Sequence, residues 1–154
     1  MINTSLCYIK CKNKVLMLHR TKKNHDPNEG KWIGIGGKFE ENESPEECML
    51  REVLEETGIT LQNWSYRGVV TFVSDKWEGE YMHLFTASVE DETVSSCSEG
   101  ELFWIDEDKI LSLNLWEGDR VFLTLLENNE PFFSLKLSYV GDALAESCLN
   151  GQKI

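Results

Sequence analysis

The sequence predicts an α/β fold in which helices cover both faces of a mixed β-sheet. Several segments alternate apolar and polar residues, as strands do, and two well-separated segments show the longer period of amphipathic helices. No linker, repeat or low-complexity run divides the chain. With 154 residues, of which 41% are hydrophobic, the chain is long enough for one domain with its own core. An α/β/α sandwich is the simplest arrangement of these elements.

The N-terminal part of the chain predicts a β-hairpin followed by a short strand. Apolar runs over residues 6–11 and 15–20 are joined by three polar residues, with Cys7, Ile9 and Cys11 on one face of the first strand. A polar loop over 21–30 leads to a strand over 32–35, which ends at a double glycine.

The C-terminal half predicts further strands and one more helix. Strands are expected over residues 66–74, 80–89, 102–105 and 131–139. A helical turn is expected over 106–111 and an amphipathic helix over 117–126. We assign residues 1–140 to the domain and expect 141–154 to be a mobile tail of the same domain that frays.

The clearest local prediction is a helix that begins at Pro45 and ends at residue 56 or 57. Ser44 is a good N-cap and Pro45 suits the first helical position. Glu47 completes a capping box with Ser44, and Gly58 provides the C-terminal stop.

The predicted helix has an apolar side and an acidic side. The apolar stripe consists of Met49, Leu50, Val53 and Leu54. The acidic side consists of Glu52, Glu55 and Glu56. Repulsion costs only about 0.2–0.5 kcal/mol per exposed pair, so an ordinary solvated acidic face is one interpretation. The other is a site for a hard divalent cation, because a double glycine lies beside the helix start and Arg51 can pair with Glu43 or Glu55.

Residues 37–59 resemble the Nudix box, G-x5-E-x7-R-E-U-x-E-E-x-G-U with U aliphatic. Every fixed position matches: Gly37, Glu43, Arg51, Glu52, Val53, Glu55, Glu56, Gly58 and Ile59. The similarity extends to residues 30–38, 116–119 and 131–134, which resemble the MutT-type 8-oxo-dGTP diphosphatases of bacteria. That family also has the α/β/α sandwich.

The resemblance implies a metal centre that holds Mg²⁺, with Mn²⁺ as an alternative. Its ligands would be the Gly36 carbonyl oxygen and the side chains of Glu52, Glu55, Glu56 and Glu99. Glu52 or Glu55 would be the general base, Arg51 would orient a glutamate and Glu43 would tie the loop to Arg51. Gly37 and Gly58 would be structural. For the ligand outside the box, Glu99 is favoured over Glu101, and an acidic surface turn is the alternative.

The resemblance also implies a nucleotide pocket. Phe72 and Trp116 would be its aromatic walls and Asp119 would read the base edge, although both aromatic residues suit the core equally and Asp119 suits the first turn of a helix. The candidate phosphate contacts, each also interpretable as a solvated basic residue, are Lys38, Arg20, Lys22 and Lys23. Ile33 stands where the mammalian oxidised-purine enzyme has asparagine, so one base-reading hydrogen bond is lost.

Composition limits the classes of function. The net charge of −12 disfavours stable binding of a nucleic-acid polymer, whereas a small nucleotide bridged by Mg²⁺ remains acceptable. Nothing resembles a membrane span or a signal peptide, and five scattered cysteines without a CxxC pair suggest the cytoplasm.

Together these features predict a Mg²⁺-dependent pyrophosphohydrolase acting on an oxidised purine deoxynucleoside triphosphate. The alternatives are another nucleotide substrate, such as a normal dNTP, ADP-ribose or a nucleotide sugar, and a non-catalytic nucleotide sensor. The complete set of Arg51, Glu52, Glu55 and Glu56 argues against the sensor.

Overall fold

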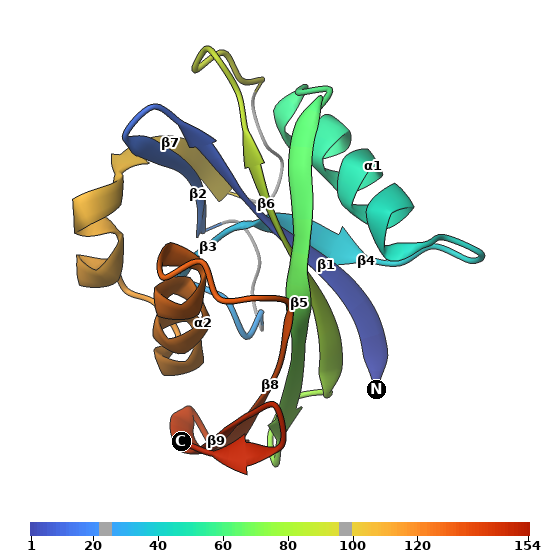
Figure 1. Cartoon of the computed structure of the whole chain (residues 1–154), viewed down its shortest axis with the longest axis vertical. Helices are drawn as coiled ribbons and strands as arrows, with labels where there is room; N and C mark the ends of the chain where they lie inside the picture. Colours follow the sequence, from blue (N-terminus) through green and yellow to red (C-terminus); the bar gives the residue numbers. More distant parts are fainter. Residues whose placement is uncertain (22–25, 96–99) are drawn as a thin grey trace.

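The computed structural model describes residues 1–21, 26–95 and 100–154. In these residues, ten strands form one sheet in the order β10-β9-β8-β5-β6-β1-β2-β3, while β4 pairs with β1 and β7 pairs with β2 (Figure 1). The strands are β1 (Ile2–Cys11), β2 (Lys14–Arg20), β3 (Trp32–Ile33), β4 (Ile35–Lys38), β5 (Asn63–Ser74), β6 (Glu80–Ser88), β7 (Gly100–Asp106), β8 (Phe133–Val140), β9 (Ala143–Leu149) and β10 (Gln152–Lys153). The helices are α1 (Pro45–Thr57), the 3₁₀ helix η1 (Glu107–Ser112) and α2 (Glu117–Glu127).

The sheet is mixed, as predicted. The pairs β1·β6 and β5·β8 are parallel, and the other strand pairs are antiparallel. Strand β1 pairs with β6, with β2 through its C-terminal end and with β4 through its N-terminal half, where Leu6 lies opposite Gly36. This pairing holds the double glycine in the middle of the sheet, next to α1.

Helix α1 has the ends that the sequence predicts. The Ser44 hydroxyl accepts a hydrogen bond from the Glu47 backbone N–H at 3.1 Å, and the Glu47 carboxylate accepts one from the Ser44 N–H at 2.9 Å. Gly58 adopts a φ of 77° and its N–H donates to the Leu54 carbonyl, which closes the helix.

Two hydrophobic clusters lie on opposite faces of the sheet. One is covered by α1, with Met49 and Val53 packed near Ile35 and Phe85, and the other includes Phe122 of α2. Figure 1 shows the two helices on opposite sides of the strands. The α/β/α sandwich is therefore confirmed.

Leu54 does not belong to the buried stripe of α1, contrary to the prediction. Its side chain is 50% exposed, whereas Met49 and Val53 are fully buried. Because each helical residue turns by about 100°, Leu54 lies past the edge of the stripe that those two residues define.

The C-terminal tail pairs with the sheet instead of fraying. Strand β9 pairs antiparallel with β8, and β10 folds back on β9. The turns between them use left-handed residues, with φ of 59° at Gly141, 50° at Asn150 and 84° at Gly151. The strand predicted over 131–139 is thus followed by two more, and it begins at Phe133.

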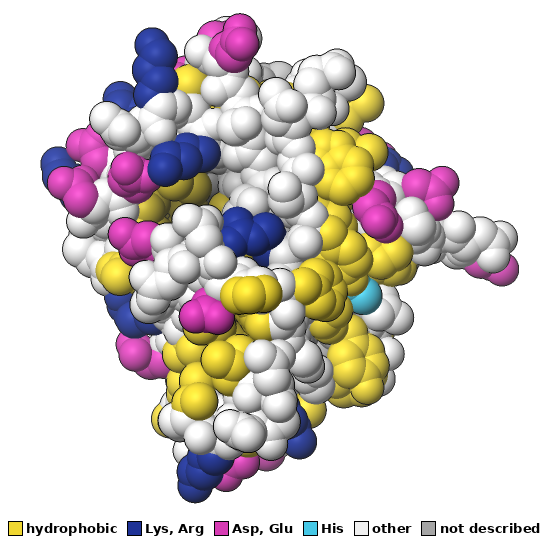
Figure 2. Space-filling view, viewed as in Figure 1, with side chains coloured by type: hydrophobic (Ala, Val, Ile, Leu, Met, Phe, Trp, Pro, Cys, Tyr) yellow, Lys and Arg dark blue, Asp and Glu magenta, His cyan; other side chains and the backbone are white. Residues whose placement is uncertain are grey.

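The face shown in Figure 2 carries exposed hydrophobic side chains along β5. Trp64 is 36% exposed and Phe132, just before β8, is 60% exposed. Lysine and arginine side chains lie singly among acidic ones on this face rather than in a continuous basic patch (Figure 2). The cavity that concerns function is lined by other residues.

Candidate active site

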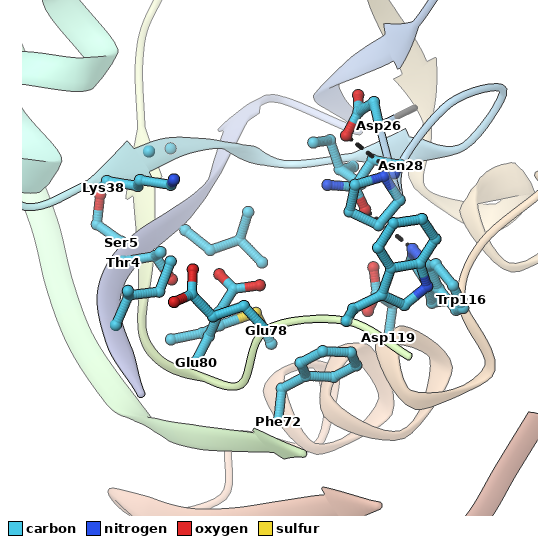
Figure 3. A pocket seen from close by; sticks show the side chains of 18 of the residues that line it. Thr4, Ser5, Asp26, Asn28, Lys38, Phe72, Glu78, Glu80, Trp116 and Asp119 are labelled. Carbon is cyan, nitrogen blue, oxygen red and sulfur yellow. Dashed lines mark hydrogen bonds between the residues drawn. The ribbon is translucent and has the colours of Figure 1, made fainter. Parts of the chain in front are cut away.

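A cavity of about 680 Å³ brings together residues from β1, β4, α1, β5, β6 and the start of α2. Its two ends differ in chemistry. Gly36, Gly37, Lys38 and Glu52 form one end, called here the glycine-loop end. Phe72, Trp116 and Asp119 form the other, called here the aromatic end (Figure 3). Gly36 and Glu52, suggested by the sequence for a metal, thus line the same cavity as Lys38, Phe72, Trp116 and Asp119, whereas Glu55 and Glu56 are not among its lining residues.

The double glycine is required by close contacts on both sides. A Cβ atom on Gly36 would lie 1.8 Å from the Ser5 carbonyl oxygen of the paired strand β1. A Cβ atom on Gly37 would lie 2.5–2.6 Å from the Glu52 carboxylate atoms. The absence of side chains at Gly36 and Gly37 therefore lets the loop backbone lie directly against the Glu52 carboxylate.

Arg51 connects the glycine loop to the acidic side of α1. Its Nε and Nη2 atoms donate to the two Glu43 carboxylate oxygens at 2.6 Å and 2.9 Å, and Nη2 also donates to the Lys38 carbonyl at 3.0 Å. Its Nη1 atom donates to Glu52 at 2.7 Å and to Glu55 at 3.2 Å. Arg51 thereby fixes the position of Glu52 relative to the loop.

The same contacts shift two ionisation equilibria. The hydrogen bonds from Arg51 lower the pKa of Glu43 to about 2, although burial acts in the opposite direction. Hydrogen bonds to Glu43, and then to Glu52, raise the pKa of Arg51 above its already high value. Both side chains are therefore charged throughout the neutral range.

The predicted three-carboxylate cluster is not assembled in the described residues. No three of their histidine, cysteine, aspartate or glutamate side chains lie close enough together to hold a metal ion. Glu52 has a side chain that is 15% exposed, Glu55 is 58% exposed and Glu56 is buried. Arg51 takes Glu52 and Glu55 as ion-pair partners through the same Nη1 atom, whereas Glu56 is buried.

The oxygen donors at this end nevertheless suit a hard cation. Glu52 faces the glycine-loop backbone inside the cavity, and Glu55 reaches the same Arg51 nitrogen as Glu52. Carboxylate and carbonyl oxygens are the donors that Mg²⁺ and Mn²⁺ prefer. Glu99 lies outside the described residues, and the alternative Glu101 lies in β7, opposite His19.

The basic residues predicted to contact phosphate separate into three groups. Lys38 lines the glycine-loop end, where Figure 3 shows its side chain beside Ser5. Arg20 also lines the cavity, but its Nε atom donates to Asp26 at 2.8 Å, and both side chains are largely buried. Asp26 therefore neutralises Arg20, which argues against the predicted triphosphate contact. Lys22 and Lys23 lie outside the described residues.

Trp116 and Phe72 line the cavity and also pack against the buried Tyr139. The Trp116 ring packs edge-on to Tyr139 with centroids 5.3 Å apart, and its Nε1 atom donates to the Asn28 side-chain oxygen at 2.9 Å. The Lys31 ammonium lies 4.9 Å from the centre of the same ring. Phe72 also packs on Tyr139, with centroids 5.3 Å apart.

Asp119 is 8% exposed and lines the aromatic end. Its side chain does not cap α2, which has Trp116 as N-cap and no side-chain capping bond. Burial raises the pKa of Asp119 to about 7, while Lys31 and Arg120 lower it and Glu80 raises it. Near neutral pH this carboxyl group can therefore both donate and accept hydrogen bonds.

Several residues lining the cavity were missed by the sequence analysis. Asn28 comes from a loop with no motif, Thr4 lies before the strand predicted over 6–11, and Glu80 begins a strand predicted only by its alternation. Thr4 and Glu80 meet because β1 and β6 pair in parallel, with Ile2 opposite Glu80. Nothing in the sequence indicates that pairing.

Comparisons with known proteins agree with the geometry. The model of the NUDIX domain matches residues 2–126. The chain is 36% identical to the uncharacterised Nudix hydrolase YvcI of Bacillus subtilis over 139 residues, which cover 86% of this chain and 84% of that protein. It is 31% identical to the oxidised purine nucleoside triphosphate hydrolase of Danio rerio over 67% of each chain. The crystal structure of a MutT protein from Bacillus halodurans superposes with a TM-score of 0.85 at 25% identity, covering 99% of both chains.

In the described part of the chain, no helix combines the length and the apolarity that crossing a bilayer needs.

Proposed function

Because the chain belongs to the Nudix family of hydrolases, we propose that it hydrolyses an oxidised purine nucleoside triphosphate, such as 8-oxo-dGTP, to the monophosphate and pyrophosphate. The observation that carries this proposal is the single cavity with a carboxylate and glycine-loop end and an aromatic end. A nucleotide has the same polarity, with phosphates at one end and a flat base at the other. The volume of about 680 Å³ is in the range of small-molecule sites.

At the glycine-loop end, a divalent cation, Mg²⁺ or Mn²⁺, would be held by the Gly36 carbonyl oxygen together with Glu52, Glu55, Glu56 and Glu99. When bound, such an ion neutralises the phosphate oxygens and lowers the pKa of an attacking water. The chain itself supplies a base, Glu52 or Glu55, to accept the proton of that water. Arg51 keeps Glu52 against the loop through the 2.7 Å hydrogen bond. Lys38 extends towards the space where phosphates would lie.

At the aromatic end, Trp116 and Phe72 would hold the purine by stacking. Asp119 would then read the base edge, and the Asn28 amide would contribute a donor, because its oxygen already accepts from Trp116. Ile33 lines the cavity but cannot form a side-chain hydrogen bond. Selectivity for the oxidised base would therefore depend on groups other than the side chain of residue 33.

The decisive test is a panel of nucleotides assayed with Mg²⁺ for release of phosphate and of pyrophosphate. We expect pyrophosphate from 8-oxo-dGTP, with a higher kcat/KM than dGTP. Equal kcat/KM for the two would contradict the sanitising role and leave a broader nucleotide hydrolase. Faster hydrolysis of ADP-ribose or a nucleotide sugar would change the substrate class. Binding without turnover of any nucleotide would indicate a sensor.

A further inference from the structure

Glu80 lies in the cavity between the two ends. It begins β6, beside Ile2 of β1, and in Figure 3 its carboxylate lies between Lys38 and Thr4 on one side and Phe72 on the other. Its electrostatic partners agree with that position, because the carboxylate interacts with Lys38 and also with Asp119. Glu80 therefore reaches the middle of the cavity rather than either end.

The surroundings of Glu80 do not explain a carboxylate there as a structural feature. Burial raises its pKa, and the Thr4 hydroxyl and the Lys38 ammonium only partly offset this effect, while nearby Glu78 adds to it. Among the described residues, no lysine or arginine forms an ion pair with Glu80. A carboxylate in a partly buried wall without such a partner is unfavourable for folding, which indicates a role toward a ligand.

We propose that Glu80 reads the sugar of the substrate by accepting a hydrogen bond from a ribose or deoxyribose hydroxyl group. This inference rests on the proposed function, which places the phosphates at the glycine-loop end and the base at the aromatic end. The sugar is the part of a nucleotide that joins them, and its hydroxyl groups are neutral donors. A carboxyl group offers acceptor oxygens in both of its protonation states. The Thr4 hydroxyl lies beside Glu80 and holds it in that orientation.

A metal ion and the base are weaker explanations for Glu80. The Lys38 ammonium already places a positive charge near Glu80, which disfavours a further cation there. The base has its own partner in Asp119, next to Trp116. The sugar thus remains the substrate group that fits a single acceptor at this place.

The test compares guanine nucleoside triphosphates that differ only in the sugar: ribose, 2′-deoxyribose and 2′,3′-dideoxyribose. For the unmodified protein we expect kcat/KM to fall about tenfold or more when the last hydroxyl is removed, because hydrogen bonds to charged groups are among the stronger ones. Glu80→Met removes the acceptor. It should bring the ratio of kcat/KM for the deoxy substrate over the dideoxy substrate to within about twofold of unity. Glu80→Gln keeps an acceptor oxygen but loses the charge, so its preference should lie between those of the unmodified protein and Glu80→Met.

Glu78→Gln is the matched control, because it removes the same charge from an exposed carboxylate that also lines the cavity. It should leave the ratio unchanged. An unmodified protein that treats deoxy and dideoxy substrates alike overturns the inference, as does a Glu80→Met variant that slows all three substrates equally.

Calorimetric binding of the same three nucleotides separates this inference from the proposed function. If no nucleotide is hydrolysed, the proposed function fails, but weaker binding of the dideoxy compound that disappears in Glu80→Met still supports the role of Glu80. Equal binding of deoxy and dideoxy compounds overturns it. Thermal melting of each variant confirms that the fold is retained.

Discussion

The Arg51 guanidinium donates two hydrogen bonds, of 2.6 Å and 2.9 Å, to the Glu43 carboxylate and so joins the loop before α1 to the middle of that helix. A paired, two-point contact of this kind is geometrically specific as well as strong. Because the same guanidinium also contacts Glu52, the position of a proposed metal ligand depends on a loop residue eight positions from Arg51.

The contact between Glu43 and Arg51 should make stability dependent on acid pH. The pKa of Glu43 is lowered to about 2 in the folded protein, against 4.5 ordinarily, so its contribution is complete above about pH 4.5 and is lost as the pH falls toward 2. Glu43→Gln should therefore be less stable than the unmodified protein at pH 7, and the difference should shrink at pH 3. Urea denaturation at the two pH values measures it, and a difference that does not change with pH would contradict the assignment.

Neutralising Glu55 or Glu56 of α1 should abolish most activity without unfolding the protein. Glu55→Gln and Glu56→Gln should each lower turnover by on the order of 10² or more, because under the proposed function each variant loses a metal ligand. Glu41→Gln, an exposed residue in the preceding loop, is the control and should behave as the unmodified protein. Mg²⁺ should raise the melting temperature of the unmodified protein more than that of the variants. Near-normal turnover of one variant at saturating Mg²⁺ would remove that residue from the site.

The two adjacent glycines should respond differently to alanine. At Gly37 the new Cβ would meet the flexible Glu52 carboxylate at 2.5 Å, so Gly37→Ala should fold but lose activity by displacing Glu52. At Gly36 it would meet the Ser5 backbone oxygen at 1.8 Å, so Gly36→Ala should be strongly destabilised or unfolded. Thermal melting together with turnover separates the two outcomes. Full activity of Gly37→Ala would show that Glu52 is free to move.

Asp119 should make the protein less stable as pH rises toward and through neutrality. Its pKa is raised from 3.8 to about 7 in the folded state, so the folded protein favours the protonated form. The contribution of Asp119 to the free energy of unfolding is therefore complete below about pH 4, and it is lost as the pH rises through 7. Asp119→Asn, which cannot ionise, should therefore be more stable than the unmodified protein at pH 8 and similar at pH 4. Denaturation curves that keep the same order at both pH values would contradict the raised pKa.

Asp119→Ala should distinguish two ways of reading guanine. Oxidation at C8 turns N7 from an acceptor into a donor, so a carboxylate facing N7 would favour the oxidised base, and its loss would collapse the ratio of kcat/KM for 8-oxo-dGTP over dGTP. If Asp119 instead binds the N1 and N2 hydrogens, both substrates should weaken together. Because the Ile33 side chain cannot form a hydrogen bond, we expect the second result, with the ratio nearly unchanged. Steady-state kinetics on the two nucleotides decides between them.

The amino-acid sequence by itself determined helix α1 and its immediate surroundings. The Ser44–Glu47 capping box, the stop at Gly58 and the i+3 and i+4 placement of the glutamates all depend on residues a few positions apart. Such contacts form wherever the local backbone is helical, so they can be read from spacing alone. The family resemblance was carried by the same short segment and its flanks.

Tertiary structure decided the walls of the cavity. The Asn28–Trp116 hydrogen bond joins residues 88 positions apart, and Glu80 enters the cavity only because β6 pairs in parallel with β1. It also decided that Arg20 pairs with Asp26 and that the C-terminal residues form β9 and β10. Long-range partners are selected by burial and strand register across the whole fold, and one strand's own alternation specifies which face is buried but not which strand lies beside it.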